Sequence, residues 1–133
     1  MGPRFGVTIL VNKVFLSIVG LAYLALAAWC SVQPEKTAKG VGFTLTPGSG
    51  QSEFLVVYGG LELALGLVFL WPLLQATETS YPLFLCLIVH ACLVLFRTLS
   101  FFLYAGIEST TYFLAATEWV IFLGAAYLSL RKS

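Results

Sequence analysis

The sequence predicts an all-α membrane protein, an antiparallel four-helix transmembrane bundle with both termini in the cytoplasm. Of its 133 residues, 59% are hydrophobic and only 10% are charged, whereas a soluble domain holds about 25% charged residues. The apolar residues also form four long runs, each near the roughly 20 residues that a helix needs to cross the hydrocarbon core. A chain of this length supports one domain, so we expect residues 1–133 to form a single four-span unit.

The first span is predicted over residues 10–32. No charged residue interrupts the run from Val14 to Val32, Lys13 stands just before it, and Trp29 is suited to the membrane interface near its end. A cleaved signal peptide is the competing interpretation, because a lysine precedes an apolar run that contains Ala25-Leu26-Ala27. The run is longer than a usual signal-peptide core, which favours the span.

Residues 33–52 are predicted to form the long outer loop, because Pro34, Pro47 and four glycines disfavour both helix and strand. A loop of this length in a small bundle is either functional or mobile, and we expect a partly ordered cover over the outer end. The second span follows over residues 53–74. Gly59, Gly60 and Gly66 keep one side of it thin, so another helix can approach closely.

The third and fourth spans are predicted over residues 82–104 and 111–130, each after a short polar turn. Four spans place both termini on one side of the membrane. That side carries Arg4, Lys13, Arg131 and Lys132, and the other side carries Lys36 and Lys39. The positive-inside rule therefore predicts an inner-membrane protein with cytoplasmic termini.

Charged residues occur within these spans, and their depths can be compared. Counting about 1.5 Å per residue from each span's midpoint puts Glu62, Glu118 and Arg97 within about 6 Å of the bilayer centre, on its outer side. The same count puts Glu53 about 16 Å out, at the headgroups, and His90 about 4–5 Å to the inner side. A lone charge at the centre costs about 2.5–3.5 kcal/mol, so we expect these side chains to meet.

Two carboxylates and one guanidinium leave one surplus negative charge. Either one glutamate is protonated, or a cation shares the site, and protonated His90 is a candidate for that cation. This pattern suits a membrane-embedded module that binds or transports a proton, a small polar solute or a cationic solute, with Tyr58 as a hydrogen-bond donor one turn from Glu62. The alternative is a structural or accessory subunit, since setting helix register is the best-attested role of such ion pairs.

Other functional classes have less support. His90 is the one histidine, and in an apolar helix it is more often hydrogen-bonded to a neighbouring helix than a ligand. Cys86 precedes it by four residues and could form one edge of a metal site, but no further histidine or aspartate completes one. We expect no metal, cofactor or nucleic-acid partner. An enzyme acting on a lipid or quinone ranks third, because no catalytic motif is present.

Three segments together resemble a known family: SEFLVVYGGLELALGL, FRTLSFFLYAG and TEWV. They are similar to the bacterial membrane family called domain of unknown function 4345, from about Gln51 to the C-terminus. The first helix is similar in hydropathy alone. The resemblance implies four spans and marks as family-type positions Glu53, Tyr58, Gly59, Gly60, Arg97 and Glu118. It also implies an uncharged residue where this chain has Glu62, so the family site would be Glu53, Arg97 and Glu118. A looser similarity to DoxX-like four-helix proteins is an analogy only.

Partners follow from the same observations. The lipid bilayer is the first. Four helices in one protomer leave little room for a channel, so a pore would need a homo-oligomer or a larger membrane complex. Gly59 and Gly60 form the expected contact face between copies.

Overall fold

Helices account for the regular structure throughout the part of the chain that is described, residues 2–75 and 78–131 of a computed structural model. The first helix, α1, spans Pro3–Val32. A continuous helix over Ser49–Leu74 follows, divided into α3 (Ser49–Phe54), a π-helical segment η1 (Leu55–Leu61) and α4 (Glu62–Leu74). The last two are α5 (Ser80–Leu103) and α6 (Ser109–Leu130). Within the described residues, four helices are long and apolar enough to span a membrane, so the predicted all-α membrane class is confirmed.

The prediction that residues 33–52 form one long loop is wrong in part. It contains a short helix, α2 (Pro34–Gly40), and the first residues of α3. Pro34 ends α1 but stands in the first turn of α2, where proline's missing N–H removes no helical hydrogen bond. Irregular backbone is confined to the residues between α2 and α3, and no strand forms there.

The other boundaries differ less from the predicted spans. α1 begins seven residues before the predicted position 10, and Pro3 again occupies the first turn. α5 and α6 each begin two residues early, at Ser80 and Ser109. The turn between them contains Gly106 with a φ of 75°, a conformation in which a Cβ atom would be strained.

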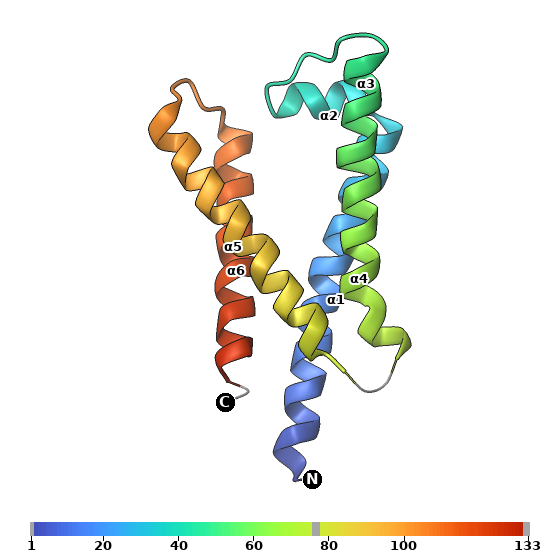
Figure 1. Ribbon diagram of the computed structural model, residues 1–133, viewed down its shortest axis with the longest axis vertical. Helices are drawn as coiled ribbons and strands as arrows, with labels where there is room; N and C mark the ends of the chain where they lie inside the picture. The colour runs from blue at the N-terminus through green and yellow to red at the C-terminus, as the bar shows by residue number, and fades with distance from the viewer. Residues whose placement is uncertain (1, 76–77, 132–133) are drawn as a thin grey trace.

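The long helices form two pairs, α1 with η1–α4 and α5 with α6 (Figure 1). α5 runs obliquely, so its beginning lies beside α1 and α4 while its end lies beside the first turns of α6 (Figure 1). Both ends of the chain lie at the lower end of the molecule in this view. The pairs meet in the lower half and diverge in the upper half.

A close crossing of backbones holds the first pair together. A Cβ atom added to Gly66 would stand 2.7 Å from Leu24 Cδ2 and 3.1 Å from the backbone oxygen of Gly20. A Cβ atom on Gly20 would stand 3.1 Å from the backbone oxygen of Gly66. The two glycines therefore let α1 and α4 approach more closely than any larger residue allows.

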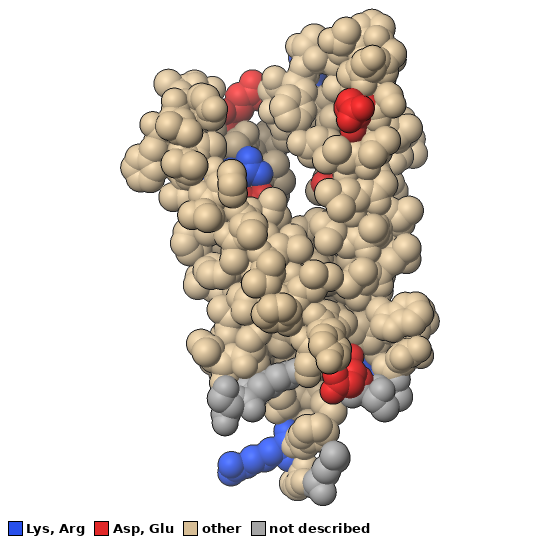
Figure 2. All heavy atoms as spheres, in the orientation of Figure 1, with Lys and Arg blue, Asp and Glu red and all other residues tan. Residues whose placement is uncertain are grey.

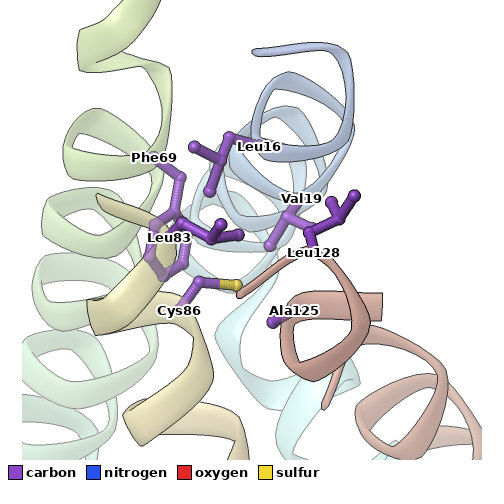
Figure 3. Close-up of a cluster of buried hydrophobic side chains, with 7 residues drawn as sticks. All are labelled: Leu16, Val19, Phe69, Leu83, Cys86, Ala125 and Leu128. Carbon is purple, nitrogen blue, oxygen red and sulfur yellow. The ribbon is translucent and has the colours of Figure 1, made fainter. Parts of the chain in front are cut away.

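The apolar core joins the two pairs in the lower half only. Its buried side chains come from all four long helices and converge on one point (Figure 3): Leu16, Val19, Phe69, Leu83, Cys86, Ala125 and Leu128. A second cluster holds the upper end of the first pair together, with Cys30 of α1, Ala38 of α2 and Phe54 of α3. No corresponding apolar cluster among the described residues joins the two pairs at the upper end.

Candidate functional site

An opening separates the two helix pairs above the core. Figure 2 shows it between the α5–α6 side and the α1–η1 side, and it passes through the molecule in that view. Acidic atoms are visible on both sides of the opening, and basic atoms on the α5–α6 side. We call this opening the crevice. Of the predicted site residues, Arg97 and Glu118 belong to the α5–α6 pair, and Tyr58 and Glu62 belong to η1 and α4 on the other side of the opening.

Arg97 and Glu118 form a two-pronged ion pair between α5 and α6. Arg97 Nε donates to Glu118 Oε2 at 3.0 Å and Nη2 donates to Oε1 at 2.6 Å. The side chains remain 27% and 14% exposed, so the pair lines the crevice and is only partly buried. Both carboxylate oxygens of Glu118 are used, and the charges of the two residues cancel.

Glu62 lies on the opposite wall, in the first turn of α4, and stands apart from that pair. No ion pair joins it to Arg97, both residues being within the described part of the chain. Its Oε2 atom is buried and has no hydrogen-bond partner among the described residues. The expected three-way cluster of Arg97, Glu62 and Glu118 is thus split into a neutral pair and a free acid.

Two tyrosines lie near enough to these charged residues to interact with them electrostatically. Tyr58 lies within electrostatic range of both Glu62 and Arg97. Tyr23 lies within range of both Glu62 and Glu118. Among the described residues Tyr58 makes no hydrogen bond to Glu62 Oε2, and its ring stacks on Phe54 at a centroid distance of 4.5 Å.

His90 is fully buried and contacts Tyr23 of α1 from its position in α5. Its Nδ1 atom is 2.8 Å from the backbone oxygen of Cys86, and its Nε2 atom is 3.0 Å from the hydroxyl of Tyr23. A carbonyl oxygen only accepts, so Nδ1 carries the proton and Nε2 accepts from Tyr23 in the neutral ring. The hydrogen bond between α1 and α5 ties the two pairs together, which is the structural role that the sequence favoured for a lone histidine.

We expect Tyr23→Phe to lower the free energy of unfolding by about 1–2 kcal/mol, because His90 Nε2 would stay buried without a donor. Tyr127→Phe is the matched control, since that ring is 63% exposed. Thermal unfolding in lipid nanodiscs measures both. Equal stability of the two variants would show that the Tyr23 hydroxyl bonds to something other than His90.

The remaining predicted site residues lie elsewhere. Glu53 is exposed in α3, outside the crevice, so the set Glu53, Arg97 and Glu118 implied by the resemblance is not brought together. Gly59 packs against α1, where an added Cβ atom would stand 2.7 Å from Ser31 Oγ. Gly60 has nothing within 4 Å of such an atom and faces a shallow groove between α1 and η1. An added Cβ atom there would therefore meet open space among the described residues.

Cys86 and His90 form no metal site with other described residues. Cys86 Sγ is 3.6 Å from His90 Nδ1. Across residues 2–75 and 78–131, no group of three or more histidine, cysteine or acidic residues has a suitable arrangement. Since His90 Nδ1 already bonds to the backbone, the pair offers no free edge to a cation.

Two features were missed from the sequence. The π-helical turn η1 ends immediately before Glu62, and such turns are frequent at functional sites. Its signal is the Gly59-Gly60 pair, which weakens a regular α-helix.

The second missed feature is Asn12, fully buried in α1, whose Nδ2 donates to Thr79 Oγ1 at 3.1 Å. The sequence placed Asn12 near the membrane surface, where its burial could not be foreseen.

A comparison with family models tests the family resemblance of the three sequence segments. The model described as Domain of unknown function (DUF4345) matches residues 11–129. The chain belongs to this family. The match begins within α1, so membership of DUF4345 extends to the first helix, which the motifs linked by hydropathy alone. Neither the curated proteins nor the solved structures gave a match.

DUF4345 is a family of unknown function, so membership of it assigns no activity to this chain. The four apolar helices make this member an integral membrane protein. What the chain does must therefore be argued from its own geometry.

Proposed function

We propose that this protein is a membrane-embedded module that binds a proton or a small polar or cationic solute at Glu62 and passes it across part of the membrane. One observation carries the proposal: Glu62 Oε2 is buried at the crevice without a partner. Arg97 and Glu118 neutralise each other, so Glu62 is the acid on the crevice wall that remains available to a ligand. An unpaired acid at membrane depth is costly, which is a reason to expect a function for it.

The proposal includes an antiparallel bundle in a bacterial inner membrane, with both termini cytoplasmic. It is supported by the position of both chain ends at the lower end of the molecule (Figure 1). Arg4, Lys13 and Arg131 belong to the segments at that end, whereas Lys36 and Lys39 belong to α2 at the other. Lys132, which the orientation prediction also used, lies outside the described residues.

A pH titration by infrared difference spectroscopy in nanodiscs tests the proposal. We expect a protonated-carboxyl band that changes with pH in the wild type and is lost in Glu62→Gln. Glu53→Gln and Glu118→Gln are the controls: the first removes an exposed acid of the same continuous helix, the second a paired acid. A band that survives in Glu62→Gln, or the absence of any such band, would contradict proton exchange at Glu62.

The second candidate function is a structural or accessory subunit, and the Arg97–Glu118 pair favours it. The pair joins two neighbouring helices by two hydrogen bonds, as expected of a device that sets helix register. In that case the Glu62→Gln variant would keep every measurable property of the wild type. A homo-oligomer would support either role, and the open face at Gly60 is its proposed contact surface.

A further inference from the structure

The crevice opens towards the sides of the molecule. Below it, the apolar core joins the two helix pairs. Above, α2 runs from the end of α1 towards the α5–α6 side in this view (Figure 1). The free flanks lie between the two helix pairs, and in a bilayer they face the acyl chains. A ligand entering by these flanks comes from the lipid phase.

The helix α2 is held in place by packing. Ala38 is fully buried against Cys30 and Phe54, and Thr37 is nearly so. Gln51 Nε2 also donates to Glu35 Oε1 at 2.9 Å, which ties α3 to α2. These contacts fix α2 against α1 and α3, and the flanks need no movement to be open.

The charges of the crevice residues indicate which charge a ligand's polar group would carry. The Arg97–Glu118 pair is neutral, and Glu62 contributes one negative charge when it is ionised. No described cation pairs with Glu62, since the ion pair of Arg97 is with Glu118. A single positive charge is therefore the complement of these walls.

We propose that the crevice accepts, from the lipid phase, an amphiphile with one cationic head group and an apolar tail, with Glu62 as its counter-charge. The inference rests on the proposed function, because both require binding at Glu62. It adds the class of ligand and the route of entry. The head group sits between the polar walls, and the tail extends through a flank among the lipid chains.

Binding of radiolabelled dodecyltrimethylammonium to the protein in phosphatidylcholine nanodiscs tests this inference, with empty nanodiscs subtracted. We expect saturable binding to the wild type and to Glu53→Gln. Glu62→Gln keeps the shape of the side chain and removes its charge, and we expect it to weaken binding by about tenfold or more. Tetramethylammonium, which has the head group without the tail, should not compete at equal concentration. Thermal unfolding confirms that each variant is folded.

The outcomes separate this inference from the proposed function. If Glu62→Gln binds the probe as tightly as the wild type, or if tetramethylammonium competes equally well, the inference is wrong. If it is wrong while the infrared band assigned to Glu62 still titrates, the crevice binds protons and the proposed function stands. If probe binding and the infrared band are both independent of Glu62, both proposals are wrong.

Discussion

Replacing Glu118 with leucine is expected to lower the free energy of unfolding by about 3 kcal/mol, because Arg97 would keep its charge inside the membrane without a partner. The structure gives Arg97 two hydrogen bonds to Glu118 and no ion pair with any other described residue. Removing both charges in the double variant Arg97→Leu/Glu118→Leu should restore most of the loss, since an apolar pair costs nothing to bury. Arg97→Leu alone is the third variant, and titration of all three with SDS in mixed micelles completes a double-mutant cycle.

The cycle also distinguishes the two candidate functions. A large coupling energy with full binding at Glu62 in the double variant would assign Arg97 and Glu118 to helix register. Losses that simply add, with no rescue in the double variant, would show that Arg97 contacts Glu62 or another acid and that the two walls are not independent.

Gly66→Ala is expected to destabilise the protein by about 1–3 kcal/mol, whereas Gly60→Ala is expected to have little effect or a slight stabilising one. At Gly66 the new methyl group would stand 2.9 Å from Leu24 Cγ and 3.1 Å from the backbone oxygen of Gly20, so α1 and α4 would have to separate. At Gly60 there is open space. Both glycines belong to the same continuous helix, which makes the pair of variants a matched comparison.

Thermal unfolding of both variants in nanodiscs measures the difference. Equal losses would mean that Gly60 is also covered, as it would be at an interface between copies. A loss at neither position would contradict the close crossing of α1 and α4.

The helices were predictable because a spanning segment needs only length and the near absence of charge. The runs around Val14–Val32 and Glu53–Leu74 provide both, and helices form there. The short helix α2 was less predictable. Pro34 breaks a helix and can also begin one, and tertiary contacts of Ala38 with Cys30 and Phe54 decide the outcome.

That charged side chains of different spans meet was predictable, but which of them meet was not. Residue counting predicts one level for Arg97, Glu62 and Glu118, and of these three the structure joins Arg97 and Glu118. Which acid meets Arg97 depends on which helices pair, and hydropathy carries no such information. The crevice itself arises because large apolar residues join the two pairs at the lower end only.

Carbodiimide labelling tests the free acid at Glu62 most directly. Dicyclohexylcarbodiimide is an apolar reagent that reaches carboxyl groups from the lipid phase and reacts with them when they are protonated. We expect mass spectrometry of the labelled protein in nanodiscs to find the modification on Glu62 and not on Glu118, whose two oxygens are held by Arg97. Equal labelling of Glu118, or no labelling of Glu62, would contradict a crevice with one free acid and one neutral pair.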